Sequence, residues 1–126
     1  MDQYMTVKDT KGTAFYRVPK FLFTDVKYSK ISTDAKILYG LLLDRMSLSE
    51  KNGWTDQYGE VYQFFTVDQA HKVLNFGHEK ICALFKELSD NKLIDRKRQG
   101  CGKASVTYLN KLPEFTLSRN PENGKK

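Results

Sequence analysis

The amino-acid sequence predicts an α+β fold of the winged helix-turn-helix type. Three observations predict it: a long apolar-patterned helix around residue 40, two shorter helices joined by a glycine-containing turn at residues 75–77, and a glycine-rich basic hairpin after them. An additional β-hairpin is expected between the first helix and the helix-turn-helix. Each element follows from local residue patterns.

Composition and length limit the architecture to one folded domain. The chain has 126 residues, of which 40% are hydrophobic and 13% aromatic, which suits a single core and is too short for two ordinary domains. The densest apolar stretch, residues 37–43, is too short to cross a bilayer, and the chain does not open on a signal-peptide pattern. We therefore expect a cytoplasmic protein with no membrane segment.

Three segments are expected along the chain. Residues 1–13 are polar with little periodicity and predict a flexible N-terminal arm, whereas residues 14–112 hold the winged-helix domain. Residues 113–126 are rich in Asn, Pro, Gly and Lys, a composition typical of a linker or tail.

The first part of the domain centres on one helix. Residues 15–18 have strand character, ended by Pro19, and residues 20–23 suit one helical turn. Ser32 is a good N-cap, and Gly40 indicates close packing against a neighbour. The residues with helical i, i+3, i+4, i+7 spacing are Ala35, Leu38, Tyr39, Leu42 and Met46.

The helix-turn-helix follows a predicted hairpin. Residues 54–55 and 61–64 flank a loop in which Gly59 supplies a positive φ, which predicts a projecting flap. The sequence TVDQ at residues 66–69 is a capping box that starts the second helix. Its predicted inner stripe is Val67, Ala70, Val73 and Leu74. The third helix is expected over residues 78–90, with Ile81, Leu84, Phe85 and Leu88 inside.

A basic hairpin completes the domain. Residues 93–98 and 105–109 predict two strands around the glycine-rich tip of residues 99–104. Lys and Arg outnumber Asp and Glu by 21 to 15, a net charge of +6. This excess is moderate and is compatible with nucleic-acid binding without establishing it, so the position of the charges matters more.

Three segments also carry a family resemblance. They are YRVPKFLF at residues 16–23, LYGLLLDRMSLS with KNGW at residues 38–49 and 51–54, and IDRKRQG with GK at residues 94–100 and 102–103. Over residues 14–110 the chain resembles the N-terminal domain of the RepA_N family of plasmid replication initiators from low-GC Gram-positive bacteria. The first two segments are specific, whereas the third alone would indicate only a generic wing.

The resemblance implies a function and partners. Such domains bind repeated sites in double-stranded DNA at a replication origin, usually as dimers. A separate C-terminal domain of the full protein recruits host replication proteins. That domain is absent from this sequence, so we expect the chain to be a piece of a longer initiator.

The third helix is the expected reader of the DNA. With its four apolar residues inward, Glu79, Ala83 and Lys86 point outward, Lys80 and Cys82 lie on the flanks, and His78 lies at the N-terminal end, which normally enters the major groove. Ala83 or Cys82 suits a thymine methyl group, Glu79 suits cytosine, and the lysines suit guanine or phosphate. The alternative is an ordinary solvated helix face.

The hairpin and the start of the second helix supply further candidates. The cations of the hairpin are Arg96, Lys97, Arg98 and Lys103. Strand alternation places Arg96 and Arg98 on one face and Lys97 on the other, and the glycines let the tip approach a backbone or a minor groove. Thr66 is a weaker phosphate candidate because capping already explains its hydroxyl. Lys36 and Lys72 are weaker still.

Metal and enzyme chemistry find little support. His71, His78, Cys82 and Cys101 have no zinc-motif spacing, and two cysteines in such a chain are expected to be free thiols. Residues 100–104 fail the P-loop pattern, and two histidines do not suit a nicking enzyme. We expect no catalytic activity, no metal and no cofactor.

Two questions stay open in the sequence. Phe15, Tyr16, Val18 and the flap of residues 54–64 are apolar enough either to form a homodimer surface or to cover their own core. A transcriptional repressor would share the fold but bind a promoter. A winged-helix module that binds protein would tolerate charge reversal of Arg96 and Arg98, and the basic hairpin argues against it.

Overall fold

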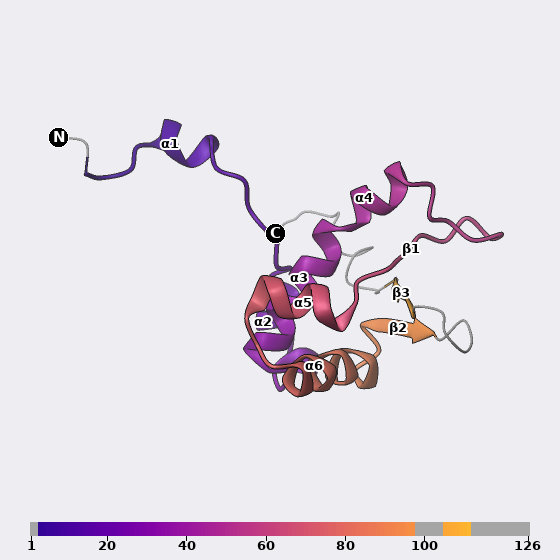
Figure 1. The fold of residues 1–126 in the computed structure, drawn as a ribbon. Coiled ribbons are helices and arrows are strands. Elements are labelled where there is room, and N and C mark those ends of the chain that lie inside the picture. Colours follow the sequence, from indigo (N-terminus) through magenta and orange to yellow (C-terminus); the bar gives the residue numbers. More distant parts are fainter. Residues whose placement is uncertain (1–2, 98–104, 112–126) are drawn as a thin grey trace.

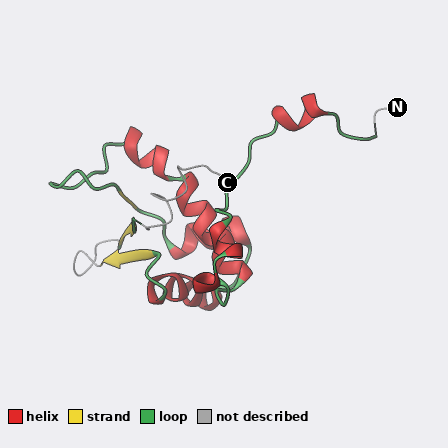
Figure 2. Cartoon of the chain, turned by 180° about the vertical axis from the view of Figure 1, so that it is seen from behind, coloured by secondary structure: helices red, strands yellow, loops and turns green. Residues whose placement is uncertain are grey.

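Helices α3 (Thr33–Asp44) and α6 (His78–Asp90) pack against each other at the centre of the fold, and α5 (Val67–Leu74) packs on α6. In this computed structural model, residues 3–97 and 105–111 are described. A small sheet lies beside the helices, and the N-terminal segment runs away from them (Figure 1). Figure 2 shows the same separation of helices and strands from behind.

The ends of α3 are fixed by specific polar contacts. The Ser32 hydroxyl accepts a hydrogen bond from the Ala35 amide and donates to the Glu87 carboxylate of α6, 2.8 Å away. The expected N-cap is therefore confirmed, and it also ties α3 to α6. The prediction that this helix continues through Met46 is wrong. It ends at Asp44 with Arg45 as its C-cap, and Met46 begins a separate helix, α4 (Met46–Lys51).

The segment before α3 differs from its prediction. The helical turn is present as α2 (Phe21–Thr24) and is followed by a 3-10 turn, η1 (Val26–Tyr28). Residues 13–19 form no strand. A strand needs a partner edge, and this segment instead lies across α3 at Gly40, where an added Cβ would be 2.9 Å from Val18 Cγ2 and 3.0 Å from the Arg17 carbonyl oxygen. The expected close packing at Gly40 is confirmed.

A short helix that the sequence did not predict lies in the N-terminal arm. Helix α1 (Val7–Lys11) has a complete capping box between Thr6 and Asp9. None of its residues is buried, and both views place it away from the other helices (Figures 1 and 2). Its own capping therefore stabilises it, with no contribution from the core.

Among the described residues, three antiparallel strands form one sheet in the order β1-β3-β2. They are β1 (Tyr62–Gln63), β2 (Ile94–Lys97) and β3 (Val106–Leu109). The predicted hairpin is present, with a bridge between Thr55 and Val61 and Gly59 at φ 79°. Its returning arm continues into β1 and pairs with β3, so it belongs to the wing sheet, and only its tip projects as a flap.

The core lies between α3, α6 and the sheet. The predicted inner residues Ile81, Leu84, Phe85 and Leu88 are all buried. Val73 is 51% exposed, so its place in the inner stripe of α5 is wrong. It lies one residue, or about 100°, from Leu74, which packs on the core, and α5 buries only one side. No helix of the described segments has the length and apolar character needed to span a membrane.

Candidate nucleic-acid interface

The turn between α5 and α6 is held in one conformation by several contacts. Asn75 adopts the left-handed conformation (φ 61°) that ends α5, and Gly77 caps the start of α6. His71 Nδ1 lies 2.6 Å from the Phe76 carbonyl oxygen, so this nitrogen carries the proton and donates. The His71 and His78 rings stack with centroids 4.7 Å apart. The N-terminal end of α6 is thereby fixed relative to α5.

His78 also contacts the first turn of α5. Its Nε2 lies 2.8 Å from Asp68 Oδ1, and this hydrogen bond lowers the pKa of the Asp68 carboxyl. Both side chains are more than half exposed, so the pair adds little stability by itself. It does orient the imidazole at the end of α6 that is predicted to enter a groove.

The outer face of α6 is open to solvent, as the helical pattern predicts. All of the predicted contact residues on it are exposed: His78, Glu79, Lys80, Cys82, Ala83 and Lys86. Three of them already have partners: His78 contacts Asp68, and two lysines form ion pairs. Lys80 Nζ lies 2.8 Å from Asp34 of α3 and 4.0 Å from the Phe76 ring centroid, and Lys86 pairs with Asp90 at 3.2 Å. These exposed pairs are weak and open readily to an incoming ligand.

The N-terminal end of α5 lies on the same helix-turn-helix unit. The Thr66 hydroxyl accepts from the Gln69 amide, and the Gln69 side chain accepts from the Thr66 amide, so the predicted capping box is confirmed. Thr66 itself is exposed. The helix end therefore presents positive dipole charge to solvent.

The two wing cations within the described residues have different surroundings. Lys97 is exposed, 3.9 Å from the Asp95 carboxylate and 5.3 Å from the Tyr108 ring. Arg96 is half-buried, and its guanidinium stacks 3.9 Å from the Phe85 ring of α6. Burial lowers the pKa of Arg96 from its ordinary value. Arg98, Cys101 and Lys103, which the sequence also singled out, lie outside the described residues.

The structure shows two basic residues in unexpected places. Lys36 is only 5% exposed, with its ammonium 4.5 Å from the Phe23 ring, so it presents no charge on an outer face. Arg45 donates to the Phe64 carbonyl oxygen at 3.1 Å and stacks on Phe65, just before α5. Sequence patterns did not find Arg45 because its partners are about 20 residues away in the chain.

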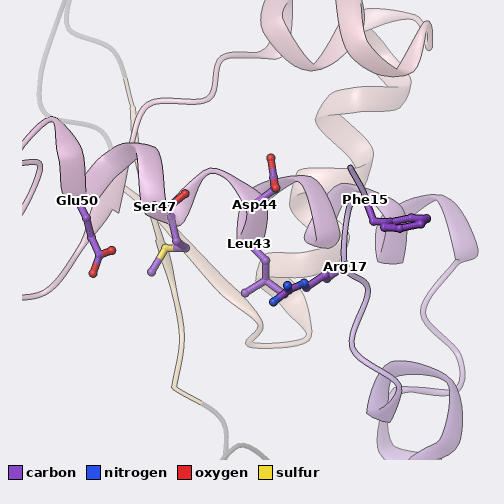
Figure 3. A pocket seen from close by; sticks show the side chains of 7 residues that line it. Phe15, Arg17, Leu43, Asp44, Ser47 and Glu50 are labelled. Atoms are coloured by element: carbon purple, nitrogen blue, oxygen red, sulfur yellow. The ribbon is translucent and has the colours of Figure 1, made fainter. Parts of the chain in front are cut away.

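A hollow of about 520 Å³ lies where the N-terminal segment passes the junction of α3 and α4 (Figure 3). Its lining combines Phe15 and Arg17 with Leu43, Asp44 and Glu50. Among the residues that the structure describes, no cluster of three His, Cys, Asp or Glu side chains suits a metal ion. The outer face of α6 remains the stronger candidate site, because the contact residues predicted on this helix are all exposed there.

Comparisons with known proteins agree with this geometry. A family model described as the N-terminus of replication initiator protein A (RepA) matches residues 14–120. A 41 kDa protein of Lactobacillus helveticus is 34% identical over 86 residues, which are 68% of this chain and 24% of that protein. The chain thus spans about a quarter of the length of this curated relative.

Solved structures give the same result. One described as the N-terminal domain of a DNA-binding protein is 36% identical with a TM-score of 0.73, covering 88% of this chain and 85% of that one. A structure of a Rep–DNA complex is 37% identical, also with a TM-score of 0.73, over 86% and 84% of the two chains. A structure of an MDR initiator is 36% identical with a TM-score of 0.72, over 94% and 100%.

The family match covers most of the chain, and the structural neighbours share its mixture of helices and a small antiparallel sheet. The expected winged helix-turn-helix fold and the expected resemblance are therefore both confirmed. The chain belongs to the replication initiator family defined by the N-terminal region of replication initiator protein A.

Proposed function

We propose that this domain binds specific double-stranded DNA at repeated sites of a plasmid replication origin, without catalysis. The observation that carries the proposal is the exposed face of α6, held at a fixed turn beside a basic wing. A structural neighbour 37% identical to the chain is described as a Rep–DNA complex, which supports the same reading. The initiation of plasmid replication is the role that follows from such binding.

In this proposal α6 lies in the major groove with its N-terminal end first. His78, Glu79 and Lys80 then lie closest to the bases at that end, and Cys82, Ala83 and Lys86 follow along the exposed face. Ala83 and Cys82 suit apolar contact with thymine, and Glu79 suits the cytosine amino group. When DNA binds, Lys80 and Lys86 leave their carboxylate partners and contact phosphates or guanine instead.

Contacts to the DNA backbone are assigned to the wing and to α5. Lys97, together with Arg98 and Lys103 from the basic sequence that follows it, supplies cations that suit phosphates or the minor groove. Thr66 lies at a helix end, where amide groups and the helix dipole favour a phosphate. These contacts set the orientation of the domain, whereas α6 sets its sequence preference.

The assembly is proposed to be a homodimer on the DNA, because duplex sites read by such domains mirror a twofold axis. Phe15 and Tyr16 are 64% and 59% exposed, which leaves them available to a second copy. Recruitment of host replication proteins is assigned to a C-terminal region outside this sequence. The protein is expected to act in the cytoplasm.

Fluorescence anisotropy with duplexes of candidate origin repeats and with scrambled duplexes tests the function. We expect tight binding of the repeats only, weakening about tenfold or more between 50 and 200 mM salt if a few phosphates are contacted. Equal and weak binding of both duplexes would contradict the proposal and leave only nonspecific charge attraction.

A pair of matched variants locates the surface. Lys86→Gln on α6 should weaken repeat binding by about tenfold, because a cation at a groove contributes about 1–3 kcal/mol. Lys51→Gln removes the same charge from an exposed position on α4, away from α6 in both views, and should leave binding unchanged (Figures 1 and 2). An equal loss in the two variants would mean that only net charge matters.

A further inference from the structure

Arg96 of β2 makes three internal contacts, and one of them is with α6. Its Nη1 donates to the Thr107 hydroxyl at 3.1 Å and to the Phe65 carbonyl oxygen at 3.2 Å, and its guanidinium lies 3.9 Å from the Phe85 ring centroid. Thr107 is on β3, Phe65 follows β1, and Phe85 is on α6. One side chain of β2 therefore reaches across the sheet and touches the helix below it.

The strand register explains why this side chain points inward. Arg96 and Thr107 are direct cross-strand partners, and Ile94, two residues earlier on the same face of β2, is 2% exposed. Lys97 points to the opposite face and is exposed. The face of β2 that carries Arg96 is thus the face that packs on the domain, and its guanidinium is held there by two acceptors and a ring.

The two acceptors of Arg96, on Thr107 and Phe65, belong to segments that determine how the sheet and the helix-turn-helix lie. Thr107 is fully buried in the middle strand of the sheet, so it has no contact with a ligand in solution. Phe65 immediately precedes Thr66, the N-cap of α5, and its ring also stacks on the guanidinium of Arg45. Two arginines, one from the end of α3 and one from the wing, therefore hold the segment that enters the helix-turn-helix.

We propose that Arg96 is a positioning residue, which sets the orientation of the wing relative to α6 so that both can engage one DNA site. This inference rests on the proposed function. The proposal gives Arg96 internal contacts in place of a direct contact with DNA. If the guanidinium moved away from its two acceptors, the buried Thr107 hydroxyl would lose its hydrogen bond from Arg96. Lys97 remains the cation that β2 offers to a phosphate.

The test separates the charge of Arg96 from the contacts that its guanidinium makes. Arg96→Lys keeps the charge but lacks the planar guanidinium, which stacks on the Phe85 ring while its Nη1 serves both acceptors. Thr107→Val removes one acceptor at nearly constant shape and changes no exposed group. If Arg96 positions the wing, each variant should weaken repeat binding by about three- to tenfold, and the double variant should be no weaker than the worse single one.

Lys97→Gln is the matched control on the opposite face of β2. It should weaken repeat and scrambled duplexes alike, reduce the slope of log K against log salt by about one, and add fully to Thr107→Val. Full binding by Arg96→Lys together with unchanged binding by Thr107→Val would overturn the positioning role and return Arg96 to the DNA-contacting cations.

A measurement on the free protein separates this proposal from the function on which it rests. Residual dipolar couplings of the β2 and β3 amides report their orientation relative to α6, which a simple loss of stability does not change. Arg96→Lys and Thr107→Val should rotate the wing, whereas Lys97→Gln should not, and unchanged couplings in the first two would overturn the proposal. If the wild type fails to prefer the repeats, the proposed function falls while these couplings still decide the role of Arg96.

Discussion

Tyr39 places a phenolic hydroxyl at the centre of the core. The side chain is fully buried, and its oxygen has no hydrogen-bond partner among the described residues. Burial, together with the nearby Tyr28, raises the pKa of Tyr39 from 10.0 to about 12. The residue was predicted from the helical spacing as a core position, but a spacing pattern carries no information on whether its hydroxyl finds a partner.

Replacing Tyr39 by phenylalanine should therefore stabilise the domain. Removal of an unpaired buried hydroxyl relieves a penalty of about 1 kcal/mol or more, so urea unfolding at pH 7 should show a higher free energy of unfolding. The exposed Tyr58→Phe is the control and should leave that free energy unchanged, since Tyr58 is 77% exposed. A loss of stability in Tyr39→Phe would show that the hydroxyl is satisfied.

The same residue predicts a pH dependence with a defined sign. Below pH 10 Tyr39 is protonated in both the folded and the unfolded chain, and its contribution is constant. Between pH 10 and about 12 the unfolded chain loses this proton first, so the free energy of unfolding falls as pH rises, by up to about 2–3 kcal/mol. In Tyr39→Phe the free energy of unfolding should fall less between pH 10 and 12 than in the wild type, when both proteins are unfolded in urea across this range.

At the scale of elements, the helices were predictable because their signals are local. The bounds of α6 and the capping box of α5 follow from spacing and from one Thr and Gln pair. Strand pairing is not local. The partner of β1 lies more than 40 residues further along the chain, so the hairpin could be predicted but not its place in the wing sheet. The internal contacts of Arg96 are also partly non-local, because its acceptor Phe65 lies 31 residues earlier in the chain.

At residues 15–18 the sequence predicted a strand that the structure does not contain. The apolar pattern of this segment suits a strand, yet its packing partner is a helix, and Gly40 makes room for it. The glycine was found from the sequence because it interrupts a strong helical pattern, while the identity of its neighbour was not. The candidate site was also only partly predictable. Helical periodicity predicted the exposed face of α6, but it did not predict the contacts of His71 and His78 that orient the start of this helix.

Gly40→Ala tests this packing. Alanine favours the helix by about 1 kcal/mol, but its Cβ would lie 2.9 Å from Val18 and 3.0 Å from the Arg17 carbonyl oxygen, and overpacking of this kind costs about 1–3 kcal/mol. We expect net destabilisation of about 1 kcal/mol in thermal unfolding. Gly12→Ala, where an added Cβ meets only the Asp9 carbonyl oxygen at an ordinary 3.8 Å, should change stability less. A more stable Gly40→Ala would mean that the segment is not seated on α3.

For the molecule as a whole, the proposed binding surface on α6 and helix α1 of the N-terminal segment are spatially separate. Helix α1 lies away from both α6 and the wing in the two opposite views (Figures 1 and 2). Phe15 lies beside the junction of α3 and α4, where it lines the hollow of Figure 3. A second copy bound at Phe15 would therefore leave α6 and the wing of each copy free for DNA.

A double substitution, Phe15→Ser with Tyr16→Ser, tests that arrangement. Both rings are more than half exposed in the single chain, so we expect little change in its unfolding and a clear weakening of self-association in sedimentation equilibrium. Val26→Ser, at an 85% exposed position on η1, is the matched control and should alter neither property. If the double variant unfolds more easily while association is unchanged, these rings cover their own core. Because each copy of a dimer would bring its own α6, the variant should also bind a pair of repeats more weakly than the wild type while still recognising a single repeat.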